Sequence, residues 1–382
     1  MKRIALVLVL VLALLICGCT PTTSDSGETT APNSSNETTA PNNDNTETTG
    51  PNSTATAHTH CACSGATVHA AANHTCADIA YEPWNLDTSV AATEYYIQGS
   101  YYLTENVTVD ARLIPTGDLH ICLNGYELTF QDLRFNTVAT VTEYTMNISD
   151  CSAGNTGKMT GTVKQMIYNT SSSTSNPDAI PATINVWAGT ISNTATNTLM
   201  GHIFQLGGTC TGNNELNIYG GNIIGGPVSN QGGVMRLSVD TVCNIYGGTI
   251  TGGTATSTAS KAAQGGNIYV TGDESQVNIY GGAISGGVAA VGTEAGAKTA
   301  QGGNIYMYKG TLTLYGGSVS SGQDLTNDNI YIAANANVKI VSVDAETKIT
   351  VASGITPNVS ELNSNTTVTN EGSVYTATKT GA

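Results

Sequence analysis

The sequence predicts an all-β fold, a single-stranded parallel β-helix (a solenoid) that follows a disordered N-terminal stalk. A five-residue phrase recurs as Asn217-Ile218-Tyr219-Gly220-Gly221, Asn244-Ile245-Tyr246-Gly247-Gly248 and Asn278-Ile279-Tyr280-Gly281-Gly282, and a second phrase, Gly-Gly-Asn-Ile-Tyr, interleaves with it. Phrases that return about every 30 residues are typical of repeat architectures, in which each unit buries its apolar face by stacking on a neighbour.

Each repeat reads as three short strands separated by glycine pairs. Val277 and Ile279 alternate with polar or aromatic residues, and a third apolar residue, Ile284, follows the Gly-Gly pair. Period-two alternation indicates strands, and glycine pairs permit the sharp corners between them. We expect such coils over residues 85–375. A propeller, the alternative all-β arrangement, would need longer units of even length.

The N-terminal residues 1–18 read as an export signal. Lys2 and Arg3 precede an apolar run over 4–16, which is too short for a permanent membrane span. The run ends Ile16-Cys17-Gly18-Cys19, which resembles the lipobox of bacterial lipoproteins. By that resemblance Cys19 becomes the lipidated first residue, and the protein is anchored outside the cytoplasm, at the cell surface, by its lipid alone. The alternative is an ordinary signal peptide with incidental cysteines.

Residues 19–57 are rich in Thr, Pro, Asn and Glu and repeat Glu-Thr-Thr-Ala/Gly-Pro-Asn. Such a segment has too little apolar surface to offset its ordering entropy, so we expect a disordered stalk. The net charge is −15, with 13 Lys and Arg in the whole chain. This composition offers no basic surface and excludes nucleic acid as a partner.

The repeated phrases also resemble a known group of proteins. Gly-Gly-x-Ile-x-Gly-Gly and Gly-Gly-Asn-Ile-Tyr, over roughly residues 95–350, are similar to the repeats of right-handed parallel β-helix surface proteins of bacteria. These belong to the pectate-lyase-like superfamily, on its adhesin and polymorphic-membrane-protein side. The resemblance implies a right-handed β-helix. It implies less about function, because the superfamily holds lyases, glycosidases and non-catalytic adhesins, and none of their catalytic motifs matches here.

A Cys/His-rich segment at 58–84 precedes the repeats, and we expect it to form a structural knuckle that covers the first coil. Cys61, Cys63 and Cys76, with His74 or alternatively His60, would give a tetrahedral Zn²⁺ site. The spacing departs from a standard zinc ribbon, and export to an oxidising space equally suits a disulfide. Free thiols are the third reading.

Four further cysteines lie within the predicted solenoid, and three of them stand at positions that the strand pattern interprets. Cys243 falls at an inward strand position and reads as a small core residue. Cys122 and Cys151 lie on strands that we expect to be neighbours, as a disulfide between coils or as two buried thiols.

Aromatic residues recur on the face opposite the apolar positions and predict two outward rows. The first row is Trp187, Tyr219, Tyr246, Tyr280 and Tyr315, and the second is Tyr269, Tyr306 and Tyr331. The recurring asparagines, among them Asn267 and Asn304, are expected to form similar outward rows. Exposed rings beside amides and hydroxyls suit an extracellular glycan. The alternative, which we favour, is that identical side chains stack between coils without a ligand.

Catalytic candidates are few. Asp240 and Glu274 each precede a repeat by four residues, so stacked coils would bring the two carboxylates about 5 Å apart, the spacing of a retaining glycosidase pair. Solvated turn charges are the commoner explanation. Two insertions, at 254–263 and 288–300, leave the same corner of adjacent coils and should emerge side by side as a recognition surface.

The sequence therefore predicts a lipid-anchored surface protein, without catalytic activity, that acts in adhesion or binds an extracellular glycan or surface protein. The alternatives are a polysaccharide lyase or glycoside hydrolase that uses Asp240 and Glu274, and a purely structural, surface-shielding protein.

Overall fold

The computed structural model describes residues 58–61, 78–88, 91–135, 141–169, 180–195, 201–207, 213–226, 230–324 and 328–381. The predicted export signal at 1–18, Cys19 and the stalk at 19–57 lie outside these residues. All regular structure in the described part is β-strand, so it contains no helix suited to cross a membrane.

Most strands belong to three parallel columns, which the chain visits in the repeating order A, B, C. Column A contains β7 (Leu133–Arg134), β10 (Ile167–Asn169), β13 (Phe204–Leu206), β16 (Met235–Leu237), β21 (Ile268–Val270) and β29 (Thr347–Val351). Column B contains β8 (Tyr144–Ser149), β11 (Ala182–Val186), β14 (Asn214–Ile218), β17 (Thr241–Ile245) and β22 (Gln276–Ile279).

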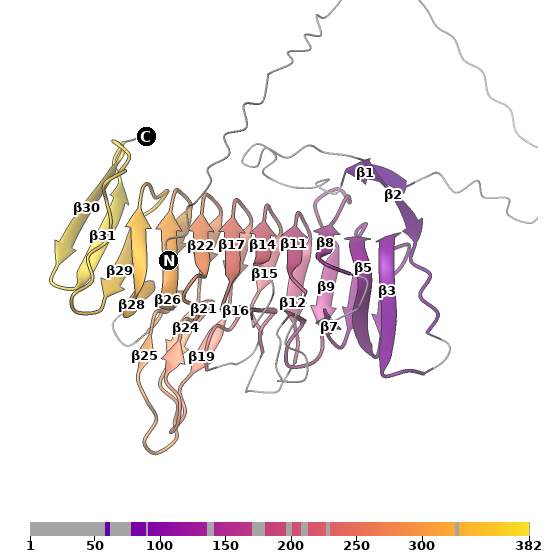
Figure 1. Ribbon diagram of the computed structural model, residues 1–382, viewed down its shortest axis with the longest axis horizontal. Coiled ribbons are helices and arrows are strands. Elements are labelled where there is room, and N and C mark those ends of the chain that lie inside the picture. The colour runs from indigo at the N-terminus through magenta and orange to yellow at the C-terminus, as the bar shows by residue number, and fades with distance from the viewer. Residues whose placement is uncertain are drawn as a thin grey trace, which may run out of the picture. The chain divides into compact units, whose positions relative to one another are not determined.

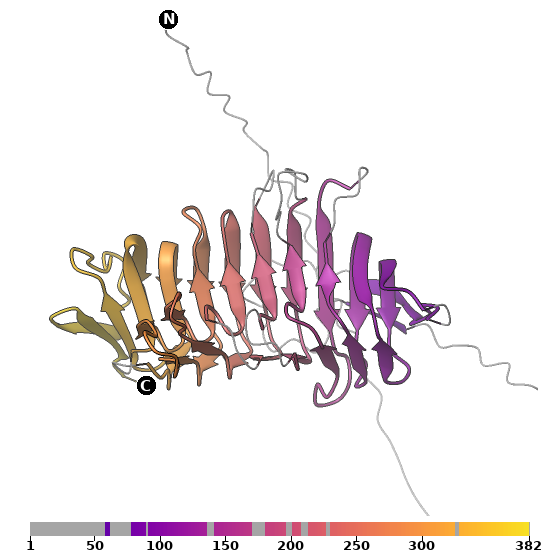
Figure 2. The same ribbon diagram turned by 90° about the horizontal axis from the view of Figure 1, so that it is seen from below.

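Four long strands pass from column A into column B: β3 (Glu94–Tyr102), β5 (Arg112–Cys122), β26 (Ile305–Leu314) and β28 (Ile330–Ile340). Column C contains β4 (Val107–Val109), β6 (Glu127–Phe130), β9 (Lys158–Gly161), β12 (Thr190–Asn193), β15 (Asn222–Ile224), β18 (Thr249–Thr251), β23 (Ala283–Ser285) and β27 (Ser318–Ser320). Figures 1 and 2 show the strands side by side from the N-terminal to the C-terminal end. This arrangement is compatible with a β-solenoid.

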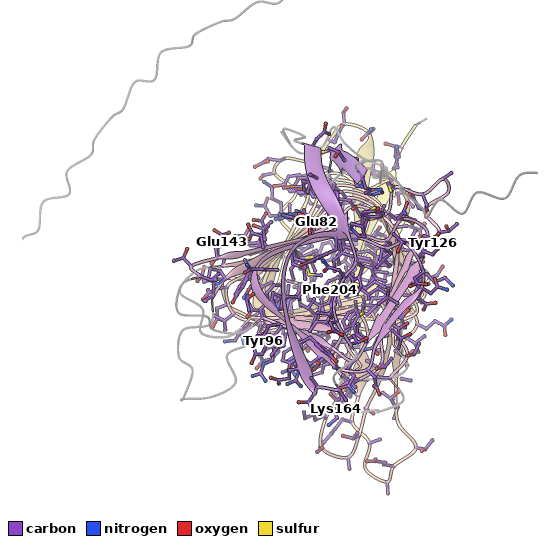
Figure 3. The ribbon with its side chains drawn as sticks, turned by 90° about the vertical axis from the view of Figure 1, so that its right-hand side faces the viewer. Glu82, Tyr96, Tyr126, Glu143, Lys164 and Phe204 are labelled. Atoms are coloured by element: carbon purple, nitrogen blue, oxygen red, sulfur yellow. The ribbon has the colours of Figure 1, made fainter. Side chains whose placement is uncertain are left out.

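Equivalent residues of successive repeats pair in register, as the sequence predicts. Asn217 pairs with Asn244, which pairs with Asn278 in the next strand. The predicted inward residues, such as Val277 and Ile279, are fully buried in one continuous hydrophobic core. Figure 3, an end view, shows side chains filling the interior around Phe204, with Tyr96, Tyr126, Glu143 and Lys164 at the periphery. Burial of these apolar faces between coils is the main stabilising contribution to the fold.

The glycine pairs between columns B and C are required by close backbone approach. Gly248 has φ of +75°, and a Cβ at that position would lie 2.6 Å from the carbonyl oxygen of Gly221 in the preceding turn. No other residue fits both the left-handed conformation and the contact. Glycine therefore recurs at this corner because the backbones of successive turns approach too closely to leave room for a side chain.

For the asparagines of the second phrase, the prediction of an outward row is wrong. Asn267 and Asn304 are fully buried, so they do not form an outward row. The amide oxygen of Asn267 accepts from the backbone N–H of Gly253 at 2.8 Å, and that of Asn304 accepts from Gly287 at 3.0 Å. Each amide thus satisfies backbone at the corner after column C, where a buried N–H would otherwise lack a partner.

Both ends of the columns carry antiparallel strands. At the C-terminal end, β31 (Val374–Lys379) pairs with β29 and with β30 (Thr366–Glu371). At the N-terminal end, β1 (His58–Cys61) pairs with β2 (Asp78–Pro83), and β2 joins the parallel sheet through β3. Column A at the C-terminal end and column B at the N-terminal end are thereby paired, which limits association through those two sheet edges, whereas β4 and β27 are the edge strands of column C.

Candidate functional site

Residues 58–61 and 78–83, β1 and β2, form a hairpin that we call the N-terminal arm; Figure 1 shows it beside β3 and β5. One ring contact holds the arm to β3, and a second lies within the arm. His58 stacks on Tyr102 with ring centroids 4.1 Å apart, and His60 stacks on Tyr81 at 4.5 Å. The arm therefore fixes the direction of two imidazole rings.

His58 and His60 meet two cysteines of the sheet, Cys122 and Cys151, in a cluster that we call the His/Cys site. One ligand atom from each of the four residues lies within 4.8 Å of all the others. The two Nε2 atoms are 3.1 Å apart, the two Sγ atoms are 3.2 Å apart, and Cys151 Sγ lies 3.5 Å from His58 Nε2. Two soft sulfurs and two imidazole nitrogens are a donor set suited to a transition metal, above all Zn²⁺.

Strand register brings the two sulfurs together. Cys122 ends β5, where it pairs with Ser149 of β8, and Cys151 follows two residues later. Both are free thiols, Cys122 buried and Cys151 half-buried. Of the two sequence-based alternatives for this pair, the structure therefore shows neighbouring thiols and no disulfide.

The surroundings favour an ionised sulfur at Cys122. Its hydrogen bond with Cys151 lowers the pKa of Cys122, and contacts with His60 and His58 lower it further against the opposing effect of burial. The same sulfur–sulfur contact raises the pKa of Cys151. One thiolate next to imidazole groups is the state from which a metal ion is bound most readily.

The zinc site predicted from the sequence differs from this cluster. Cys61 forms a disulfide bond, so its sulfur is not available as a thiolate ligand. Cys63, His74 and Cys76 lie outside the described residues. His60, the alternative ligand, is part of the His/Cys site, whereas His58, Cys122 and Cys151 were not predicted as ligands. These three residues are far apart in the sequence, so no local motif identified them as ligands. The expected proximity of Cys122 and Cys151 indicated two of the four ligands of the His/Cys site.

The first aromatic row is a continuous stack, which we call the first stack. Successive ring centroids from Trp187 through Tyr219, Tyr246, Tyr280 and Tyr315 are 3.8, 4.9, 4.8 and 4.7 Å apart, with interplanar angles of 7°, 4°, 11° and 1°. In the second row Tyr269, Tyr306 and Tyr331 follow at 5.8 and 5.2 Å. The rings of the first stack and the pair Tyr306–Tyr331 therefore stack between turns, the alternative favoured from the sequence. Tyr269 is tilted by 40° against Tyr306, and these two rings are buried, so the prediction of an outward second row is wrong for them.

Exposure changes along the first stack. Trp187 and Tyr219 are 2% and 8% exposed, and Cys61 and Ile79 of the N-terminal arm pack against them. Tyr280 and Tyr315 are 39% and 38% exposed. Within the stack each ring face covers its neighbour, so mainly ring edges meet solvent, whereas a sugar ring stacks on a face. Glycan binding along this row stays a prediction.

Among the described residues, no hydrogen bond or ion pair connects the side chain of Asp240 or Glu274 to another functional group. Asp240 lies in a turn with φ of +55°, and Glu274 is exposed in the turn before β22. Lys309 forms its ion pair with Asp273, at 2.9 Å, and not with either candidate. Neither carboxylate lines the open hollow of about 560 Å³ beside Tyr331 and Tyr375 at the C-terminal end.

The two insertions meet as predicted and form a projection, which we call the fin. Strand β19 (Thr254–Thr256) pairs in parallel with β24 (Val288–Ala290), and β20 (Ala263–Gln264) pairs with β25 (Ala300–Gln301). Figure 1 shows the fin extending below the columns. Its interior is a cluster of four buried alanines, Ala255, Ala263, Ala289 and Ala300.

Comparison with family models, with curated proteins and with solved structures finds no match for this chain.

Proposed function

We propose that the chain is a lipid-anchored protein of the bacterial cell surface whose body is a right-handed parallel β-helix without catalytic activity. Its function is adhesion, through binding of an extracellular glycan or surface protein. The export signal, the lipobox-like Cys19 and the stalk support the location. The three in-register columns support the proposed β-helix architecture. The fin is the single observation on which the proposed binding function mainly depends.

The fin is an ordered structure with little core of its own. Its two halves are held by polar contacts at the tip: the Ser257 hydroxyl donates to the Lys298 carbonyl at 2.9 Å, and the backbone N–H of Ala259 donates to a Glu294 carboxylate oxygen at 3.1 Å. Four alanines bury little apolar surface, so the fin adds little to the stability of the stack. Ordered insertions that project from a repeat scaffold commonly form its recognition surface.

The chemistry of the fin tip suits a neutral polar partner. Lys261, Glu294 and Lys298 are exposed together with the apolar side chain of Val291 and several hydroxyl groups. Charges of both signs with hydroxyls and one apolar contact match glycans or protein loops better than a strongly charged polymer. The chain's net charge of −15 also disfavours polyanions.

The test is binding of the full-length chain to glycan arrays and to a panel of purified extracellular proteins. A fin variant carries Lys261→Ala, Val291→Ser and Lys298→Ala, and a matched variant carries Tyr280→Ser and Tyr315→Ser in the first stack. We expect the fin variant to lose at least about tenfold in affinity, or 1.4 kcal/mol, and the matched variant to keep its affinity.

Two results would contradict the proposal. One is binding that survives in the fin variant and is lost in the first-stack variant, which would transfer recognition to the tyrosines. The other is turnover of a polysaccharide, seen as new reducing ends or unsaturated products, that disappears in Asp240→Asn. That result would establish the enzyme alternative.

A further inference from the structure

We propose that a Zn²⁺ ion bound by His58, His60, Cys122 and Cys151 fastens the N-terminal arm to the side of the strand columns. The metal would stabilise the position of the arm and shield the buried end of the first stack from solvent. This role is independent of what the fin binds.

The spacing of the four ligand atoms already approaches a tetrahedron. With Zn–S bonds of about 2.3 Å and Zn–N bonds of about 2.05 Å, a tetrahedral site has edges of about 3.8 Å between sulfurs, 3.3 Å between nitrogens and 3.5 Å between sulfur and nitrogen. Here the sulfur–sulfur and nitrogen–nitrogen distances are 3.2 and 3.1 Å, one sulfur–nitrogen distance is 3.5 Å, and all the ligand atoms lie within 4.8 Å of one another. Adjustments of about half an ångström on these three edges, and of at most about 1.3 Å on the other sulfur–nitrogen edges, would therefore complete the coordination sphere through movements of flexible side chains.

The orientation of His60 is that of a metal ligand. Its Nδ1 lies 2.7 Å from the carbonyl oxygen of Cys61, to which it can only donate. In the neutral imidazole this hydrogen bond leaves Nε2 unprotonated, and Nε2 points at His58 and the two sulfurs. A carbonyl on the far nitrogen that fixes the tautomer is the usual second-shell partner of a zinc-bound histidine.

The donor set selects the metal. The His/Cys site contains no carboxylate or other oxygen ligand among its four members, so it does not suit Ca²⁺ or Mg²⁺. Two thiolates neutralise a divalent cation, which lowers the cost of burying it, and two cysteines with two histidines are a standard structural zinc set. With four protein ligands the coordination sphere is closed, so the ion has a structural role.

Such an ion would join parts of the chain that are remote in sequence. His58 and Cys151 are 93 residues apart, and the ligands come from the arm, from β5 and from the segment after β8. The arm also packs on Trp187 and Tyr219 through Cys61 and Ile79. Zinc would therefore hold the arm over the buried end of the first stack and keep those two rings from solvent.

The first experiment measures zinc in the full-length chain, purified without chelator and, in parallel, reduced and reloaded with Zn²⁺. We expect one zinc per chain and, with Co²⁺ in its place, the intense absorption of tetrahedral thiolate coordination. His58→Gln and Cys122→Ser should each lower zinc content at least tenfold. His120→Gln and Cys243→Ala, a histidine and a cysteine outside the site, should keep it.

The variants also separate this site from the one predicted from the sequence. Cys63→Ser with Cys76→Ser should leave zinc content unchanged, whereas a loss of zinc in that variant with retention in His58→Gln would overturn the proposal. Failure of the reduced, reloaded chain to hold zinc, with Cys122 and Cys151 in a disulfide or as free thiols, would overturn it as well. Because β1 is outside the columns, His58→Gln should keep the far-UV β-sheet spectrum, which distinguishes lost ligation from misfolding.

Discussion

Replacement of Asn304 by leucine tests the account of the buried asparagines. The Asn304 side chain is fully buried and makes four hydrogen bonds. Its Nδ2 donates to the Ser320 carbonyl at 2.9 Å and to Asn329 at 3.4 Å, and its oxygen accepts from the Gly287 N–H at 3.0 Å and from Asn267 at 2.7 Å. Leucine has the same branched side-chain skeleton, so the loss of these bonds is the main effect of the change, and its bulkier methyl groups can only add to the cost.

The expected cost follows from the groups left without partners. The Gly287 N–H and the Ser320 carbonyl are backbone groups at a packed corner, and the Asn267 amide is fully buried. At roughly 1–2 kcal/mol for each unsatisfied group, Asn304→Leu should lower the free energy of unfolding by about 4 kcal/mol. For about 275 described residues, at about 2.1 cal/mol/K per residue, this is a fall of about 7 °C in melting temperature.

Thermal unfolding followed by far-UV circular dichroism or calorimetry measures this effect. Two asparagines elsewhere in the repeats serve as controls. Asn278 makes one side-chain bond within its row, to Asn244 at 3.0 Å, and Asn278→Ala should cost about 1 kcal/mol. Asn222 is exposed and accepts from Thr249 at 2.8 Å, and Asn222→Ala should cost less than about 0.5 kcal/mol. A melting temperature for Asn304→Leu no lower than that of Asn222→Ala would show that the buried hydrogen bonds of Asn304 do not stabilise the fold.

Three further predictions concern groups in the core and in the first stack. Burial lowers the pKa of His202 to about 4, although its Nδ1 lies 2.6 Å from the Gly232 carbonyl oxygen. In the unfolded chain this histidine has a pKa near 6.5, so between pH 6.5 and 4 the unfolded state binds more protons than the folded state. The free energy of unfolding is therefore highest above pH 6.5 and falls by about 3 kcal/mol towards pH 4. His202→Gln should reduce that pH dependence in denaturant titrations, and an unchanged slope would contradict the assignment. Chelation of zinc should shift the emission of Trp187, now 2% exposed, to longer wavelength in a Trp84→Phe background, and an unchanged spectrum would mean that the arm stays in place without metal. Tyr246→Ala removes ring contacts on both sides, at 4.9 and 4.8 Å, and should cost about 1–3 kcal/mol in denaturant unfolding; a cost near zero would show that stacking contributes nothing to stability.

Elements with a local signal were predictable from the sequence. The alternation around Ile279 and the repeated Asn-Ile-Tyr-Gly-Gly phrase predicted inward faces and in-register stacking, and both are confirmed. The fin was predictable for the same reason, because two insertions at equivalent places in successive repeats must emerge together. The antiparallel strands at 366–379 were not predicted, since they carry no repeated phrase.

The burial of Asn267 and Asn304 could not be read from alternation alone. Strand periodicity places a residue on one face or the other, but it does not apply at a corner, where the backbone turns and a side chain can point back towards main-chain groups. The glycines before these asparagines marked the corner, yet the N–H groups that the amides satisfy belong to the segment that follows column C.

The repeating β architecture and the register of its rows are readable from the amino-acid sequence, because both depend on residues a few positions apart and on a period that recurs along the chain. Which cysteines and histidines meet depends instead on how the chain folds in three dimensions. The His/Cys site brings His58 and His60 of β1 to Cys122 and Cys151, over a separation of as many as 93 residues. Cys61, the cysteine adjacent to His60 in the sequence, is in a disulfide bond instead. Such a meeting depends on the path of the arm over the columns, and no local pattern encodes that path.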